Sequence, residues 1–131
     1  MQNPRFTKEE QSIIQECDTP EKVQNFLNSL EYNFEESGVK TWRSFRGVVK
    51  HRKAHCFEAA ITAAAILSQH GFPPLVICIE ASDIDHNIFA FWQNGKVGSL
   101  AKSRQVELHD RPPTYKTYRD LVMSYYPDYY N

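Results

Sequence analysis

One of the three cysteines in this sequence stands where a thiol can react. Cys56 follows the basic run Lys50–Lys53 and opens an alanine-rich segment without glycine or proline. Alanine is the strongest helix former, so His55–Leu67 is predicted to be a helix with Cys56 in its first turn. The unpaired N–H groups and the positive dipole end at a helix start favour the thiolate form of a cysteine. Cys56 is therefore the candidate nucleophile.

A cysteine nucleophile needs a base, which cysteine enzymes take from a histidine distant in sequence and near in space. His86 is the best candidate because it leads a strand-length apolar run that should pack on the Cys56 helix. Asp83 and Asp85 lie beside it and are expected to raise its basicity. The sequence thus predicts a catalytic pair of Cys56 and His86.

The other two cysteines are predicted to be buried core thiols. Cys17 falls on the apolar side of a short helix, and Cys78 lies inside the continuous apolar run Leu75–Ile79. An odd number of cysteines without a C-x-x-C pair disfavours a disulfide scaffold. We therefore expect a protein of the reducing cytoplasm.

The elements that position the pair come as helices first and strands later. Thr19-Pro20 starts a helix with an apolar stripe that ends at Leu30, and Ser44 caps a second short helix. Gly71 and Pro73-Pro74 end the Cys56 helix, which is apolar on nearly every side and is therefore predicted to be buried.

Three strand-length runs follow that helix, at 75–79, 88–92 and 96–100. Asn94-Gly95 predicts a tight hairpin between the last two. The tail is expected to begin at Pro112-Pro113 and to end in a helix around 118–123. This order predicts an α+β fold in which a central Ala-rich helix packs on a small antiparallel sheet.

Size and charge narrow the classes of protein that this sequence can represent. Its 131 residues fit a single domain spanning 1–131. A formal net charge of -1 gives no global attraction for nucleic acid or an anionic membrane. The longest apolar stretch, Ala59–Leu67, is too short to span a bilayer, and the first residues lack a secretory pattern. We expect a soluble protein without nucleic-acid or membrane partners.

Two other patterns could carry chemistry. His51 and His55 have the spacing of two metal ligands on one helical face, and Cys56, Glu58 and His109 are the residues that could join them. The central glutamate of a zinc protease motif is absent, so a metal site is the weaker interpretation. The basic run before Cys56 fits a solvated helix face, which can also tune the thiolate or receive an acidic substrate. No cofactor is implied.

The chain resembles the transglutaminase-like branch of the papain-like cysteine enzymes, and most closely a small bacterial transglutaminase-like group. The resemblance covers about residues 19–130 and implies Cys56 as nucleophile, His86 as base and a transglutaminase-like core. It rests on the order and spacing of five stretches, Ala54–Ala60, His70–Leu75, Asp85-His86, Val97–Ser103 and Leu121–Tyr126.

One position departs from the pattern of these enzymes. They usually place an aspartate on the strand after the histidine strand to orient the imidazole, and Ala101 stands there. Ser99 and Ser103 share its strand face if the strand continues, and Asp110 lies further along. A serine orients an imidazole but does not stabilise its charged form as a carboxylate does.

Two functions are therefore expected. The first is a thiol-dependent hydrolase or acyl transferase acting on a peptide or protein amide through a thioester at Cys56. Backbone N–H groups at the start of the Cys56 helix would stabilise the oxyanion. The second is a catalytically inactive binding module of the same fold.

Overall fold

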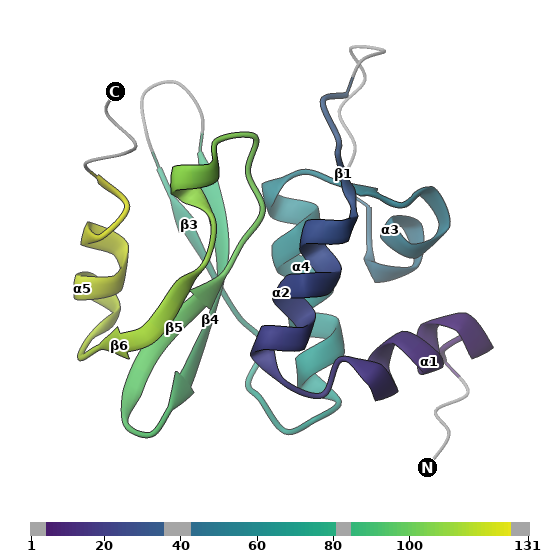
Figure 1. Cartoon of the computed structure of the whole chain (residues 1–131), viewed down its shortest axis with the longest axis horizontal. Coiled ribbons are helices and arrows are strands. Elements are labelled where there is room, and N and C mark those ends of the chain that lie inside the picture. The colour runs from purple at the N-terminus through teal and green to yellow at the C-terminus, as the bar shows by residue number, and fades with distance from the viewer. Residues whose placement is uncertain (1–4, 36–42, 81–84, 127–131) are drawn as a thin grey trace.

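The computed structural model describes residues 5–35, 43–80 and 85–126 of the chain. A four-stranded antiparallel sheet separates two groups of helices, with α1 to α4 on one side and α5 on the other (Figure 1). The predicted α+β architecture, a helix packed on a small antiparallel sheet, is confirmed. Within the described residues, no helix has the length and apolar character needed to cross a membrane.

The sheet has the strand order β3-β4-β5-β6. Its strands are β3 (Leu75–Ile79), β4 (His86–Gln93), β5 (Lys96–Leu100) and β6 (Arg111–Tyr115). Asn94 and Gly95 form the turn between β4 and β5 with φ of 54° and 78°, the backbone that the Asn-Gly pair favours. The predicted hairpin is therefore confirmed.

β6 is the strand that the sequence did not predict. Pro112 and Pro113 lie inside it, at the point where the tail was expected to begin. Proline has no N–H to donate to a neighbour, and β6 is an edge strand that pairs only with β5 among the described strands. The prolines are therefore compatible with β6, because an edge strand tolerates residues without an N–H donor that a central strand does not.

Side chains cap most of the helices. These are α1 (Lys8–Glu16), α2 (Pro20–Ser29), α3 (Phe45–His51), α4 (Cys56–Ser68) and α5 (Tyr118–Met123), with a 3-10 turn, η1, at Val106–Leu108. The hydroxyls of Thr7, Thr19 and Thr117 each accept a backbone N–H of the first helical turn, as N-caps do. Ser44 precedes α3 without a side-chain capping bond.

α4 is the central helix of the domain. Ala59, Ala60 and Ala63 are fully buried, and their small side chains let neighbouring elements approach the helix closely. On the sheet side, α4 packs with Phe89 and Phe91 of β4 in one core cluster. The prediction of a helix buried on most sides is confirmed.

A second apolar cluster lies on the other face of the sheet, beneath α5. It contains Ile88 and Ala90 of β4 together with Leu121 and Tyr125. Because side chains alternate along a strand, odd-numbered residues of β4 face α4 and even-numbered ones face α5.

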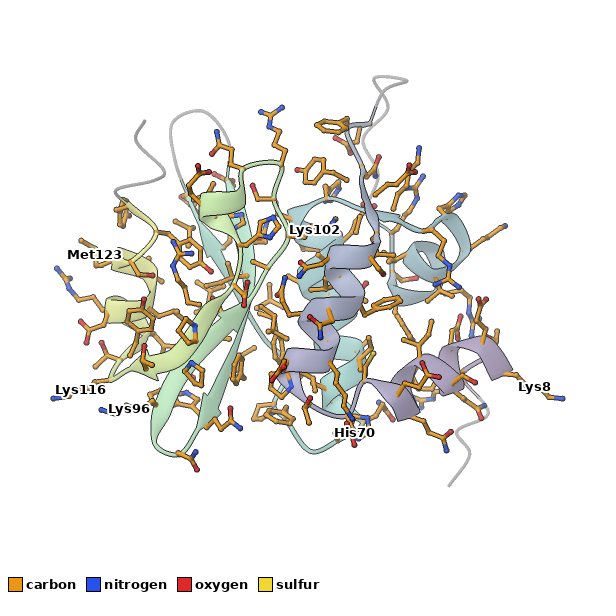
Figure 2. The ribbon with its side chains drawn as sticks, viewed as in Figure 1. Lys8, His70, Lys96, Lys102, Lys116 and Met123 are labelled. Carbon is orange, nitrogen blue, oxygen red and sulfur yellow. The ribbon has the colours of Figure 1, made fainter. Side chains whose placement is uncertain are left out.

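Two very short strands complete the described fold. β1 (Glu31–Tyr32) pairs in parallel with β2 (Lys53–Ala54), so that Tyr32 lies opposite Ala54. This pairing brings the segment that follows α2 to the start of α4. Near the end of α2 that leads into β1, buried Lys102 donates to the carbonyl of Leu27 (Figure 2).

Candidate active site

Cys56 is the first residue of α4, as predicted, and it is half-buried. His55 is the N-cap, and its Nδ1 accepts the backbone N–H of Glu58 over 3.3 Å. The Glu58 carboxyl accepts the His55 N–H over 3.1 Å in return. This reciprocal capping fixes where the helix begins, and therefore places the thiol in the first turn.

The thiol faces the start of β4. Its Sγ lies 3.8 Å from the carbonyl oxygen of Asp85, and the Asn87 side chain donates to Sγ from Nδ2, also over 3.8 Å. Asn87 is thus a contact of the thiol that the sequence did not predict.

Tyr32 lies on the other side of the helix start. The backbone N–H of Cys56 lies near its phenol oxygen and acts to lower the pKa of Tyr32. Burial is the main reason that the pKa of Tyr32 is raised, and the cation of Arg104 acts in the opposite direction. The phenol, the thiol and a cation therefore share one region of the surface.

His86 is the first residue of β4, as its sequence position suggests, but its ring lies on the α5 face of the sheet. Its Nε2 is 2.6 Å from the Leu108 carbonyl, and its ring meets that of Tyr125 edge-on at 5.4 Å. A carbonyl only accepts, so Nε2 carries the hydrogen and Nδ1 is the acceptor nitrogen of the neutral ring. The structure places Cys56 and His86 at the same end of β4 without bringing their side chains together.

The basicity expected for His86 is not found. Burial lowers its pKa to about 4, with smaller lowering contributions from His109 and Arg111 and a raising one from the Leu108 carbonyl. Asp85 is exposed. Asp83 lies outside the described residues.

The candidates for a third catalytic residue take other roles in this structure. Ala101 is buried, and the Gln24 side chain both donates to its carbonyl and accepts its N–H. Ser99 is buried with its hydroxyl 2.6 Å from that of Tyr125. β5 ends at Leu100, so Ser103 is not on the strand, and its hydroxyl accepts the N–H of Gln105. Asp110 is exposed.

The two other cysteines differ from one another. Cys17 is buried as predicted, and burial raises its pKa. Cys78 is exposed, so its prediction as a core thiol was wrong. It lies opposite Asn87 in the β3–β4 pairing, and an apolar strand at the sheet edge leaves one of its residues open to solvent.

The two histidines of the proposed metal pattern, His51 and His55, have different structural roles. His51 is exposed in the last turn of α3, whereas the His55 ring is used in capping α4. Among the residues that the structure describes, no group of three or more His, Cys, Asp or Glu side chains could hold a metal ion.

The comparison with solved structures defines the class of the fold. A structure titled "Crystal structure of a TGase" matches this one with a TM-score of 0.52 and 19% sequence identity, over 79% of this chain. The match spans 35% of that chain, so this domain corresponds to about a third of the transglutaminase. The fold is therefore transglutaminase-like, as the sequence resemblance implied.

The comparison with protein families is more specific. The vasohibin family model matches residues 3–131, and the chain belongs to this family. Vasohibins share the transglutaminase-like cysteine peptidase fold. The sequence analysis predicted a transglutaminase-like protein, and the family model confirms this and identifies the family as the vasohibins.

Proposed function

We propose that this protein is a cysteine peptidase with Cys56 as its nucleophile. The observation that carries the proposal is the setting of the thiol at the start of a buried helix, with the Asn87 amide directed at Sγ and the Tyr32 phenol near the Cys56 N–H. A core cysteine has no need of such polar neighbours. They fit a sulfur that carries negative charge before it attacks a carbonyl.

The same neighbours can stabilise the charge that develops during the attack. When Sγ adds to a peptide carbonyl, the carbonyl oxygen becomes an oxyanion that needs N–H or O–H donors. The Cys56 N–H and the Tyr32 hydroxyl are the donors proposed for this oxygen, because the hydroxyl can donate its own hydrogen to it. Collapse of the intermediate releases the amine and leaves a thioester, which water hydrolyses.

His86 is the proposed base. It stands between Asp85 and Asn87, which both contact the thiol, so its backbone lies beside Sγ. To take the proton, the ring must leave the Leu108 carbonyl and turn toward the α4 face. His86 is the first residue of β4, so only the end of the strand has to change. Nδ1 is the nitrogen that would accept the proton.

The substrate proposed is a protein chain cut near its carboxyl end. The vasohibin family acts on protein substrates, at the C-terminus of tubulin. In this chain the cation of Arg104 lies close enough to Tyr32 to affect its pKa. A cation near Tyr32 can pair with a terminal carboxylate, which an internal peptide bond does not offer.

The test compares two peptides of the same sequence, one ending in a free carboxylate and the other in an amide, incubated with wild-type protein and with Cys56→Ala. We expect release of the terminal residue from the free carboxylate only, and none with Cys56→Ala, detected by mass spectrometry. Arg104→Gln should raise KM for the first peptide. Binding of the peptide without any cleavage by the wild type would contradict the proposal and identify a binding module.

A further inference from the structure

The most buried acid near the thiol has no part in the chemistry proposed above. Glu58 is in the first turn of α4 and is 0% exposed. Acidic side chains are rarely buried so completely without partners. Its Oε1 accepts from Asn33 Nδ2 over 3.0 Å and from the His55 N–H over 3.1 Å, while Oε2 accepts the Arg43 N–H over 2.9 Å.

These donors come from three separate segments of the chain. Asn33 follows β1, Arg43 precedes α3, and His55 precedes α4. The two that share Oε1 stand next to the residues of the candidate site, since Asn33 adjoins Tyr32 and His55 adjoins Cys56. One oxygen atom therefore joins the backbone that carries the phenol to the backbone that carries the thiol.

We propose that Glu58 is a positioning residue of the active site, which holds Tyr32 in register with Cys56. This inference rests on the proposed function for its meaning, but the geometry stands without it. The parallel pairing of β1 with β2 consists of two residue pairs, Glu31 with Lys53 and Tyr32 with Ala54. Two backbone bonds hold so short a ladder, from the Glu31 N–H to the Arg52 carbonyl and from the Asn33 N–H to the Ala54 carbonyl. The bond of the Asn33 side chain to Glu58 adds a link from this segment to α4.

The carboxyl group suits this role for two reasons. It accepts at both oxygens, as a carboxylate does, so all three N–H donors find an acceptor in a place closed to water. It also lies in the first turn of α4, where negative charge is favoured by the helix dipole. A glutamine of the same size would present an amide NH2 to at least one of these donors, and that bond would be lost.

Glu10 provides a matched control elsewhere in the fold. It is likewise the acid of a capping box, in the first turn of α1, and is 2% exposed. Its oxygens accept from the Thr7 N–H and from the Arg46 guanidinium. α1 lies at the other end of the helical layer from β1 (Figure 1). Glu10→Gln therefore measures what the loss of a buried capping acid does to stability alone.

The experiment measures two quantities in wild type, Glu58→Gln and Glu10→Gln. The first is the rate at which iodoacetamide alkylates Cys56, read from its tryptic peptide because Cys78 is also exposed. The second is kcat and KM for the free-carboxylate peptide. We expect Glu58→Gln to lower kcat about 10- to 100-fold with KM within about twofold, as expected for a small misplacement. The alkylation rate of Cys56 should fall as well, whereas Glu10→Gln leaves both unchanged.

A second variant covers a failure of Glu58→Gln to fold. Asn33→Ala removes one donor to Oε1, and it should lower kcat in the same direction by a smaller factor. The proposal is overturned if each of the two variants that folds reduces only thermal stability, as expected for Glu10→Gln, and leaves the alkylation rate at the wild-type value. A wild type without peptidase activity would refute the proposed function, but the alkylation rates would still decide the role of Glu58.

Discussion

The two faces of the sheet at the start of β4 are built in different ways. On the α4 face, half-buried Cys56 has long contacts of 3.8 Å to Asp85 and Asn87. On the α5 face, His86 and Tyr125 are 3% and 0% exposed, and their polar contacts are 2.6 Å long.

The difference indicates what each face can do. The short bonds under α5 are made within the protein, so that face is complete without a ligand. The thiol face has a reactive atom, polar neighbours and access to solvent. The chain thus separates a surface suited to reaction from a buried network suited to holding shape, and His86 is the residue whose function decides how strict this separation is.

The largest expected effect comes from His86→Gln, which tests whether His86, buried on the α5 face, takes part in the reaction of Cys56 on the α4 face. The Gln Nε2 can replace the imidazole N–H toward Leu108, but the side chain cannot act as a base. We expect kcat/KM to fall about 1000-fold, within the usual range for loss of a general base. If peptide cleavage is unchanged and only the urea midpoint falls, His86 belongs to the buried network alone.

The second largest expected effect is a loss of unfolding free energy at acid pH, caused by His86 on the α5 face. The pKa of His86 is about 4 in the folded protein, below its ordinary value of 6.5, so the unfolded chain binds the proton more readily. The contribution of neutral His86 to the unfolding free energy is therefore fully present above pH 6.5. It decreases by about 3 kcal/mol as the pH falls from 6.5 to about 4. Urea unfolding at several pH values checks this. In His86→Gln that part of the pH dependence should disappear.

On the thiol face, Tyr32→Phe should lower kcat about 100-fold, the usual cost of losing one oxyanion donor. The ring stays, so its contact with Phe34, at 4.8 Å between centroids, and the fold should be retained. Steady-state kinetics and a thermal melt measure the two sides of this prediction. An unchanged kcat would remove Tyr32 from the chemistry.

The smallest expected effect is that of Tyr125→Phe on the α5 face. It removes a hydroxyl that donates to the His109 carbonyl and lies 2.6 Å from that of Ser99. The ring contacts with His86 and with Arg111, whose guanidinium is 4.0 Å from the ring centroid, remain. We expect a loss of about 2 kcal/mol in unfolding free energy. The alkylation rate of Cys56 should not change, and a change there would show that the two faces are coupled.

The sequence predicted the thiol side of the site better than the histidine side. Alanine propensity and the basic approach placed Cys56 at a helix start, and Asn94-Gly95 placed the hairpin, because both signals are local. The run Ile88–Trp92 is apolar throughout, so it carries no alternation to tell which residues face α4. Side chains two positions apart in a strand share a face, so Asn87 lies on the same face as Phe89. This reasoning leads to the contact between Asn87 and the thiol only when it is known that the face of Phe89 packs on the Cys56 helix.

Two other features had no local signal. β1 and β2 are two residues long, and their pairing depends on the position of α4 rather than on strand propensity. Glu58 reads as an ordinary acid of a first helical turn, since nothing in sequence distinguishes a solvated glutamate from one that meets Asn33, Arg43 and His55. Such roles arise from tertiary contacts alone.

The side chains around the Cys56 thiol come together only when the domain folds, so the reactivity of Cys56 reports on folding. Asn87 is 31 positions away from Cys56 in the chain, and the chain between them must close into a loop before the amide can reach the sulfur. An unfolded chain therefore carries an ordinary cysteine at this position. Alkylation of Cys56 in increasing denaturant would then show whether the site opens before the domain unfolds.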